Sequence, residues 1–588
     1  MKRTRLLLVC LLVTVAVSTP ATAQEAETFA RFVPEGAVFY ATTQNFESVW
    51  RGIERSNFWA KLTRLKLWEG VDFGWYDDFR DNFAESLGFE FSTKNVMAVF
   101  GKEFAVALYL DADEEHETGA KVELIFVCRM NPADAVETMV DKLVERAKGQ
   151  GDDVVISSVE HRGAKVRSIR AKDDVPPVQL RWAISDDVLI AGIGNGPPNI
   201  EGCLDCMAGE GAPLAANEDV GKLLGMARQD RGTFFSEMYF SLGECRRVLT
   251  EYGGDEPELA PLINMLDIMS ASAEALALTT RLDRGLRIKL AVEPGAEAAE
   301  LMALVSEAPP SAGTHLKYVP PDALMYFGAN SMPPLGELWP HMMKQWAKFG
   351  FDEMVRDVTE QIELALDLDF KTDLLDNLGT EFAVALEALD IENQPFPFPK
   401  MTVLFQVKDT AKAQALIDKI VALLEEAASP EEEITVTDLV HQGAKLKTVA
   451  IARPPGIELT PTIGITENFL FISSGEDYAK ATLDAAKAGT SLANSPLYRS
   501  LGIPDKTNSI AFINMTEAMN TGRDVVDWIV EMAEMQGAGE ETKEQVDELV
   551  TPLLDCLSAL KAFAGYSVVT PEGAGAVYIL RVEDIPAD

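Results

Sequence analysis

The sequence contains few of the side chains on which enzymes and metalloproteins depend. Its 588 residues include five histidines and six cysteines. No pair of histidines has the spacing of a zinc site, and neither an HExxH helix nor a GxSxG elbow occurs. Cys10 lies in an N-terminal apolar run, and the five cysteines that follow are an odd number, which is no disulfide framework. The sequence therefore has no zinc-enzyme, serine-hydrolase or disulfide-scaffold signature.

Basic residues are scarce as well. The chain has 52 Lys and Arg residues against 93 Asp and Glu residues, and its net charge is −41. Because such a chain repels phosphate groups, we expect neither nucleic acid nor an anionic membrane surface as a partner. Beyond the N-terminal run, no apolar stretch approaches the roughly 20 residues that a transmembrane helix needs, so we expect no membrane span.

The first residues have the pattern of a secretory signal peptide. Three basic residues precede a short apolar run at 6–17, and small residues at 21–23 form a cleavage site. We therefore predict that residues 1–23 are removed and that the mature chain is exported and soluble, in the periplasm or outside the cell. Cleavage leaves 49 of the 52 basic residues and all 93 acidic residues, so the mature chain is still more acidic.

Several short sequence blocks occur twice in the same order. Residues 100–108 (FGKEFAVAL) recur at 378–386 (LGTEFAVAL), and 161–165 (HRGAK) recur at 441–445 (HQGAK). Collinear matches at a nearly constant separation indicate a duplication. A stretch rich in Pro and small residues separates the copies and is typical of a linker. We predict the following division: signal peptide 1–23, first α+β repeat domain 24–305, Pro-rich linker 306–315 and second α+β repeat domain 316–588.

Each copy alternates short β-branched segments with amphipathic helical ones. Consecutive strands joined by short turns are antiparallel. A helical stretch such as 415–424, with apolar residues three and four apart, needs a sheet face on which to bury them. We therefore predict an α+β fold, namely two tandem copies of a mostly antiparallel β-sheet with helices packed on one face. A single sheet that combines strands of both copies is the alternative.

The repeated blocks resemble a known family. The segment Val-Pro-x-x-Ala at 33–37 and 319–323, the Gly-x-Glu-x-Ala-x-Ala-Leu block and the hairpin with a central glycine are similar to the domain-of-unknown-function 3352 family of exported bacterial proteins. The resemblance covers most of both copies. It implies export and supports the fold, but this family has no activity, cofactor or catalytic residue that can be assigned to the chain.

Two polar residues recur in both copies and are candidate catalytic groups. Glu103 and His161 of the first copy correspond to Glu381 and His441 of the second. A histidine beside a carboxylate can transfer protons in catalysis. The alternative, which we favour, is that these residues and Lys165 form turns and ion pairs. A requirement of the fold persists in both copies, whereas a duplicated enzyme often keeps one working site.

A CxxC pair, Cys203 and Cys206, occurs once. Such a pair lowers a thiol pKa in redox enzymes. When the copies are aligned at the helix end, the corresponding residues are Leu483 and Ala486, which are apolar. We therefore interpret both cysteines as small buried residues, and a local disulfide is the alternative in an oxidising compartment.

Two loops resemble ligand-binding motifs without completing them. The glycine-rich stretch 192–196 has Pro197 where a dinucleotide loop requires its third glycine, so it predicts a strand-to-helix turn and no cofactor. Asp111, Asp113 and Glu115 are the best candidate metal ligands, for calcium. The glycine and the glutamate that complete an EF-hand loop are missing, which favours a solvated hairpin loop.

The helices near the end of each copy are rich in methionine and aromatic residues. Met265 and Met269 lie in the first copy, and Trp528, Met532 and Met535 in the second. Methionine adapts its shape to a ligand, so such a surface suits a lipid or a peptide. The alternative is that these side chains cover the sheet.

Taken together, these patterns favour an exported, acidic, non-enzymatic protein that binds a ligand or partner in the periplasm or cell envelope. Its partner would be an envelope protein, a peptide, a glycan or a lipid. One alternative is an envelope hydrolase that uses carboxylate and histidine chemistry. Another is an acidic structural protein that attracts cations and binds divalent ions weakly.

Overall fold

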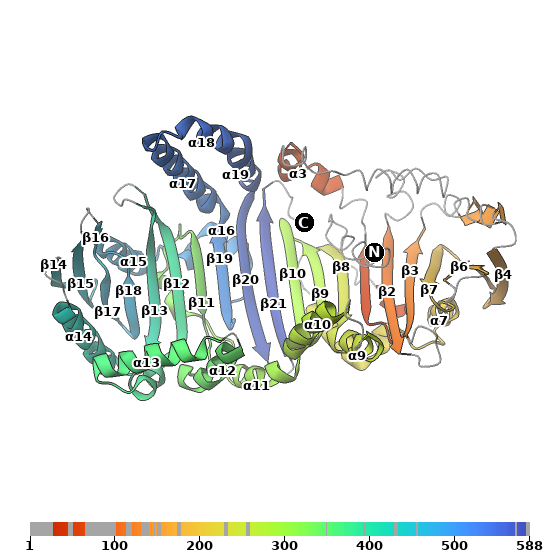
Figure 1. Cartoon of the computed structure of the whole chain (residues 1–588), viewed down its shortest axis with the longest axis horizontal. Coiled ribbons are helices and arrows are strands. Elements are labelled where there is room, and N and C mark those ends of the chain that lie inside the picture. The colour runs from red at the N-terminus through yellow and green to blue at the C-terminus, as the bar shows by residue number, and fades with distance from the viewer. Residues whose placement is uncertain are drawn as a thin grey trace. The chain divides into compact units, whose positions relative to one another are not determined.

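A computed structural model describes most of the chain. The described residues are 28–44, 51–64, 102–112, 120–130, 140–142, 144–145, 148–149, 154–172, 178–228, 233–253, 259–348, 350–391, 396–427, 433–453, 457–570 and 573–583. The predicted signal peptide, 1–23, lies outside them. The described residues form two compact units. Unit 1 extends to Ala299 and includes Glu583, and unit 2 extends from Glu300 to Val582 (Figure 1).

Unit 1 contains an antiparallel sheet. Its strands are β1 (Phe39–Gln44), β2 (Glu103–Ala112), β3 (Ala120–Arg129), β4 (Val154–His161), β5 (Ala164–Ala171), β6 (Gln179–Ser185), β7 (Val188–Gly194), β8 (Thr233–Ser241), β9 (Ala273–Leu282) and β10 (Gly285–Pro294). They lie in the order β4-β5-β6-β7-β3-β2-β1-β8-β9-β10. The helices are η2 (Phe29–Arg31), α3 (Asn57–Leu62), α7 (Ile200–Met207), η5 (Leu214–Ala216), α8 (Glu218–Ala227), α9 (Leu242–Gly253) and α10 (Ala260–Ser272).

Unit 2 also contains an antiparallel sheet. Its strands are β11 (Met325–Ala329), β12 (Leu378–Asp390), β13 (Phe398–Val407), β14 (Glu433–His441), β15 (Ala444–Arg453), β16 (Ile457–Leu459), β17 (Thr462–Thr466), β18 (Phe469–Ser473), β19 (Ser509–Asn514), β20 (Leu560–Thr570) and β21 (Gly573–Val582). Strands β16 and β17 both pair with β15, and the order is β14-β15-β17-β18-β13-β12-β11-β19-β20-β21. The two units thus have the same strand order when β16 and β17 together correspond to β6.

The helices of unit 2 are more numerous in the described chain. They are η6 (Thr314–Tyr318), α12 (Leu335–Lys348), α13 (Asp352–Leu366), η7 (Phe370–Leu374), η8 (Leu375–Asn377), α14 (Thr410–Ala427), α15 (Glu476–Ala488), η9 (Leu492–Asn494), α16 (Pro496–Ser500), α17 (Met515–Met535), α18 (Gly539–Gln545), η10 (Val546–Val550) and α19 (Thr551–Leu557). Helix α11 (Ala296–Ser306) contains the boundary between the units. Figure 1 shows α12 and α13 at one end of the strands of unit 2 and α17–α19 at the other.

The α+β fold is confirmed, but helices pack on both faces of each sheet rather than on one. In unit 2, Phe469 and Phe471 join the core under α15 and α16, whereas Leu470 between them joins the core under α14. In unit 1, Ala107 lies in the core with α7 and α8, and Leu108 packs against α9 and α10. Adjacent strand residues point to opposite faces, and a run of apolar residues without alternation therefore needs cover on both.

The repeated glycines lie in the turns of the hairpins that were expected from the sequence. Between β4 and β5, Arg162 and Gly163 have φ values of 55° and 77°. Between β14 and β15, Gln442 and Gly443 have φ values of 50° and 87°. Two successive left-handed residues form the tight turn whose twist matches paired strands, and glycine adopts this conformation without strain.

The segment predicted as a linker, 306–315, is anchored in unit 2. Ser311 forms a bridge with Thr507, and its hydroxyl donates to the carbonyl of Asn330. His315, at the end of the segment, is fully buried. The small polar residues that suggest a flexible linker serve here as partners for neighbouring backbone groups.

Candidate functional site

The recurring histidines fasten a hairpin to a helix. His161, which ends β4, lies with its Nε2 2.9 Å from Oδ1 of Asp205 on α7. His441, which ends β14, lies with its Nε2 2.8 Å from Oδ1 of Asp484 on α15. The residue after each histidine contacts the same carboxylate, since Arg162 donates to Asp205 at 2.7 Å. The two units therefore hold a hairpin turn against a helix in the same way.

These contacts also determine the charge of the carboxylates. Hydrogen bonds from Arg162 and then His161 lower the pKa of Asp205 below its ordinary value. Hydrogen bonds from Gln442 and then His441 lower the pKa of Asp484. Both carboxylates are thus kept ionised as acceptors, which suits a structural contact between hairpin and helix.

Glu103 lies at the start of β2 and is buried. Its Oε1 accepts from the side chain of Gln44 at 3.0 Å, and its Oε2 lies 3.4 Å from Nε of Arg129. Burial raises the pKa of Glu103, and the hydrogen bonds from Gln44 and Arg129 oppose this shift only in part. The carboxylate therefore links β1, β2 and β3, and its described partners do not include His161.

Glu381 occupies the corresponding position on β12 but has different partners. Its carboxylate accepts from the backbone N–H of Thr314 at 2.6 Å and of His315 at 3.2 Å, and from Nδ1 of His315 at 3.0 Å. Nε2 of His315 lies 2.7 Å from the hydroxyl of Tyr326. Burial raises the pKa of Glu381, but the bonds from His315 and Thr314 outweigh it and leave the pKa below its ordinary value.

The structure thus does not bring the predicted glutamates and histidines together. The histidine that does meet Glu381 is His315, which sequence reasoning overlooked. A signal was present, because His315 lies four residues before Val319, where the repeated Val-Pro block of the second copy begins. Lys165 is exposed on β5, opposite Glu160 in the strand register. The fully buried His315 serves as a partner for Glu381 inside unit 2, where substrate has no access.

A second carboxyl that sequence reasoning overlooked is Glu387 on β12. Its Oε1 accepts from the hydroxyl of Thr482 on α15 at 2.9 Å and from that of Thr402 on β13 at 3.4 Å. Burial raises the pKa of Glu387 from 4.5 to about 7, although both hydroxyls oppose this shift. Three residues further along, Asp390 accepts from the hydroxyl of Tyr478 on α15 at 3.1 Å. Two carboxyls of β12, those of Glu387 and Asp390, therefore accept hydrogen bonds from side chains of α15.

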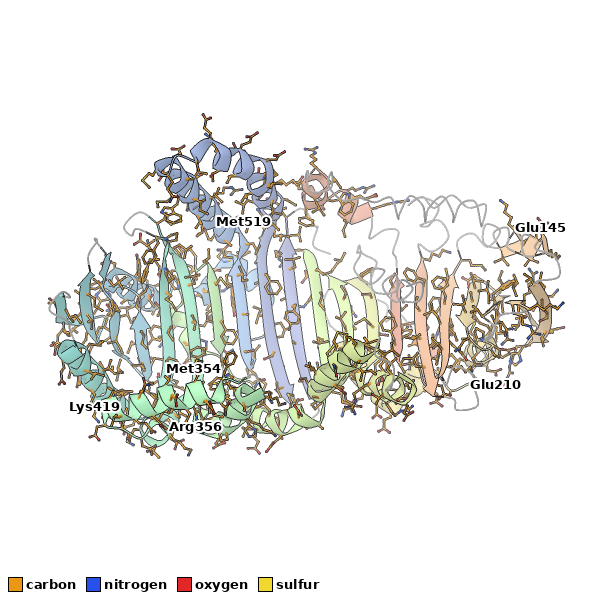
Figure 2. The ribbon with its side chains drawn as sticks, viewed as in Figure 1. Glu145, Glu210, Met354, Arg356, Lys419 and Met519 are labelled. Carbon is orange, nitrogen blue, oxygen red and sulfur yellow. The ribbon has the colours of Figure 1, made fainter. Side chains whose placement is uncertain are left out.

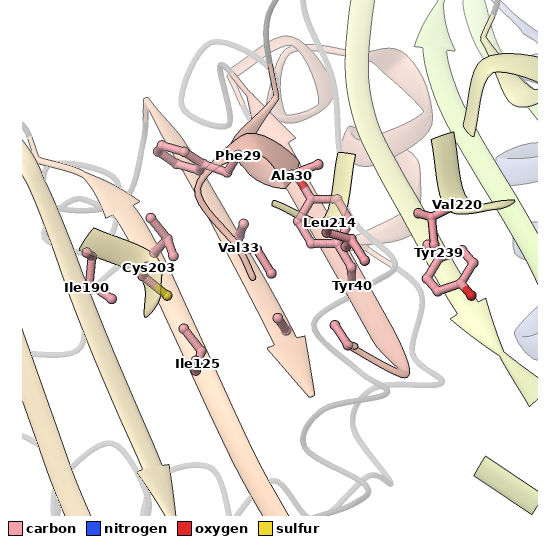
Figure 3. Packing of buried hydrophobic residues seen from close by; sticks show 14 of the residues in the cluster. Phe29, Ala30, Val33, Tyr40, Ile125, Ile190, Cys203, Leu214, Val220 and Tyr239 are labelled. Carbon is pink, nitrogen blue, oxygen red and sulfur yellow. The ribbon is translucent and has the colours of Figure 1, made fainter. Parts of the chain in front are cut away.

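The CxxC pair consists of buried free thiols. Cys203 lies in the apolar core with Ile190, Ile125 and Val33 (Figure 3). Burial raises the pKa of both Cys203 and Cys206, which disfavours the thiolate that redox chemistry requires. The cysteines therefore behave as the small buried residues we favoured.

The hairpin-to-helix contacts also refine the alignment of the copies at this helix. Because Asp205 corresponds to Asp484 in the contact with histidine, Cys203 corresponds to Thr482. This position is one residue from the Leu483 inferred from the sequence. Thr482, like Cys203, is fully buried, so the position requires a small side chain in both units.

The glycine-rich stretch forms a tight turn in which the chain approaches itself. A Cβ on Gly192 would lie 2.5 Å from Cβ of Pro198, and one on Gly194 would lie 2.7 Å from the carbonyl oxygen of Val122. Asn199 caps α7 by accepting from the backbone of Gly202. The glycines are therefore explained by close packing at a capped strand-to-helix turn.

The predicted calcium ligands are described only in part. Asp111 is exposed near the end of β2, and Asp113 and Glu115 lie outside the described residues. Among the described residues, no three His, Cys, Asp or Glu side chains gather closely enough to hold a metal ion.

The helices of both units leave large apolar side chains exposed. In unit 1 they are Met265, Ile268 and Met269 of α10. In unit 2 they include Met354, Val358 and Leu364 of α13, and Ile529, Met535, Leu549 and Leu553 of α17–α19. Trp528 and Met532 are half-buried. In Figure 2, Met354 and Arg356 project from opposite sides of α13, so one helix presents an apolar and a charged surface.

One family model matches part of the chain. The family described as "Protein of unknown function (DUF3352)" matches residues 272–549, from the end of α10 into η10. This stretch contains the last strands of unit 1 and most of unit 2. No curated protein and no solved structure gives a significant match. In the part of the chain that the structure describes, no helix combines the length and apolar character of a transmembrane helix.

Proposed function

We propose that the chain is an exported, acidic, non-enzymatic protein that binds a partner in the periplasm or cell envelope. It consists of two tandem copies of the DUF3352 unit. Export is supported by the signal-peptide pattern of residues 1–23. The tandem arrangement is supported by the repeated sequence blocks, by the common strand order and by the hairpin-to-helix contact that both units contain.

The observation that supports binding is the exposure of large apolar side chains on the helices. Ile268 of α10 and Met535 of α17 are each 74% exposed, and Leu364 of α13 is 86% exposed. Apolar side chains that gather on a surface mark interaction sites, and methionine adapts to the shape of its partner. By contrast, Glu381 and the histidines contact other groups of the protein.

A thermal-shift screen of the mature chain, residues 24–588, tests this proposal against metals, glycans, lipids and peptides. We expect a peptide or a lipid to raise the Tm, and we expect the triple variant Ile268→Gln, Leu364→Gln, Met535→Gln to lose that shift. Because the three side chains are exposed, the unliganded variant should keep the Tm of the wild type.

Two outcomes would contradict the proposal. An undiminished shift in the triple variant would show that the ligand does not use these helices. Turnover of an envelope substrate that His161→Ala and His441→Ala abolish without loss of stability would favour a hydrolase. Export is tested separately by N-terminal sequencing of the protein from a periplasmic fraction, where we expect Gln24 as the first residue.

A further inference from the structure

The segment from α17 to α19 in unit 2, residues 515–557, is strongly acidic. We call it the acidic arm. It contains eleven acidic and two basic residues. One of the two basic residues, Arg523, pairs with Asp555 of the same segment at 3.0 Å. The acidic arm thus has a large excess of carboxylates for which it supplies few cations.

The same segment presents apolar side chains to solvent. Helix α17 is 21 residues long and all of it is described, yet none of its residues is buried. Ile529 and Met535 of this helix are exposed by 42% and 74%, and Leu549 and Leu553 of the following helices by 46% and 39%. A helix of this length usually buries an apolar stripe against its own protein.

The packing inside the acidic arm brings α17 against α19. A Cβ on Gly522 would lie 3.3 Å from Leu554, one residue before the ion pair of Arg523 with Asp555. Helices α17 and α19 are antiparallel at this contact (Figure 1), and Figure 2 marks Met519 near the base of α17.

We infer that the acidic arm binds a cationic amphipathic helix of another protein. This inference rests on the proposed binding function and specifies its partner. Lysine and arginine side chains would meet the carboxylates, while large apolar residues three and four apart would cover Ile529, Met535 and Leu549. The long stems of lysine and arginine can lie along apolar surface while their charges reach the carboxylates.

Charge favours this partner over other occupants of the apolar surface. A second copy of the chain has the same strongly negative net charge, −41 for the full sequence, and would be repelled. An anionic lipid surface would be repelled for the same reason. A cationic helix has the complementary charge, which accelerates association and selects the partner.

Helix α10 of unit 1 exposes apolar side chains without an excess of charge. It exposes Met265 and Ile268, as the acidic arm exposes its own apolar residues. Its charges are balanced, however, because Asp267 lies 3.5 Å from Arg246 of α9. If apolar exposure alone determined binding, both surfaces would bind the same peptide.

The test is fluorescence anisotropy with the mature chain and three labelled synthetic peptides of 21 residues, the length of α17. The first has lysine and leucine at amphipathic helical spacing. The second replaces lysine with glutamate, and the third scrambles the lysine–leucine sequence. We expect the first to bind more tightly than the others and to weaken at least about tenfold between 50 and 500 mM salt.

Matched variants locate the site. We expect Ile529→Gln with Leu549→Gln, and separately Glu531→Lys with Glu534→Lys, each to weaken binding of the first peptide about tenfold. Val159→Thr with Val440→Thr, at exposed apolar residues of β4 and β14, should leave the affinity unchanged. The Tm of each variant confirms that it is folded.

Each contrary outcome overturns a different statement. If the glutamate peptide binds equally well, the inference that the partner is cationic is wrong, but the proposal that the exposed apolar helices bind a partner still holds. If the scrambled peptide binds equally well, the contact is unspecific attraction between charges and the inference is wrong. If none binds while a glycan or lipid raises the Tm, the inference fails and the proposed function stands. If nothing binds at all, both fail.

Discussion

Units 1 and 2 place a glutamate at the same point of the repeated Gly-x-Glu-x-Ala block, yet the two carboxyls have opposite pKa shifts. Burial raises the pKa of Glu103, which has one amide and a half-exposed arginine as partners. Glu381 is buried too, but two backbone N–H groups and His315 lower its pKa. Both units place a carboxyl at this position, while the neighbouring residues determine the direction of its pKa shift.

The largest expected effect comes from removing the better-bonded carboxyl. Glu381→Ala leaves the N–H group of Thr314 and the buried N–H and ring of His315 without their acceptor, so we expect a loss of about 3–5 kcal/mol in the free energy of unfolding. Glu103→Ala should cost less, about 1–3 kcal/mol, because Arg129 can turn to solvent. Urea unfolding at neutral pH measures both, and equal losses would contradict the comparison.

The pH dependence of Glu387 gives the next effect. Its folded-state pKa of about 7 lies above the ordinary 4.5, so its stabilising influence is complete below 4.5 and is lost as the pH rises through 7. Glu387→Gln keeps an acceptor for Thr402 and Thr482 and cannot ionise. We therefore expect it to stabilise unit 2 at pH 8 by up to about 3 kcal/mol and to have little effect at pH 4.5.

The corresponding residue of unit 1, Tyr109, provides the control for that measurement. Its hydroxyl donates to the carbonyl of Pro34 at 2.8 Å. Tyr109→Phe should cost about 1 kcal/mol, with no change between pH 5 and 8. If urea unfolding of Glu387→Gln showed the same pH profile as the wild type, Glu387 would not titrate in this range.

A smaller effect distinguishes the equivalent positions Cys203 and Thr482. The hydroxyl of Thr482 donates to Glu387, whereas Cys203 lies among apolar residues. We expect Cys203→Thr to cost about 1–3 kcal/mol because it buries a hydroxyl in the apolar core, and Cys203→Ala to cost about 1 kcal/mol. The midpoints of urea unfolding compare the two variants. If Cys203→Thr were as stable as the wild type, the core of unit 1 would have to supply an acceptor for the threonine hydroxyl.

The smallest effect should be common to both units. His161→Ala and His441→Ala each remove a half-exposed contact with an aspartate. Since such contacts contribute little, we expect each variant to lower the Tm by about 2 °C or less. A large loss in one variant only would show that the two hairpins are not held in the same way.

The strands and their pairing were largely predictable, because the evidence for them is local. Antiparallel strands were expected from the short β-branched segments of each copy, and the hairpins at Gly163 and Gly443 from their central glycines. The packing of helices on both faces was not predicted. Whether Leu470, between two buried phenylalanines, is covered depends on α14, which is distant in the sequence.

The polar sites were less predictable for the same reason. His161 and Glu103 recur in both copies and suggested a pair, but each has its own partner, and the partner of Glu381 is His315. The raised pKa of Glu387 arises from burial beneath α15, and sequence spacing does not reveal it. Exposed methionines on the late helices were anticipated as a class, although Trp528 and Met532 are half-buried.

The sequence by itself determined the α+β class, the hairpin turns and the acidic charge of the chain, because strand alternation, glycine turns and composition are local properties. Only the tertiary structure decided which carboxyls have raised or lowered pKa values, which cysteines are buried and which apolar helix residues remain exposed. Each of these depends on what surrounds a side chain, and its neighbours come from segments far apart in the chain. The acidic arm depends on both: its charge follows from its sequence, and the exposure of its apolar residues follows from how its helices pack.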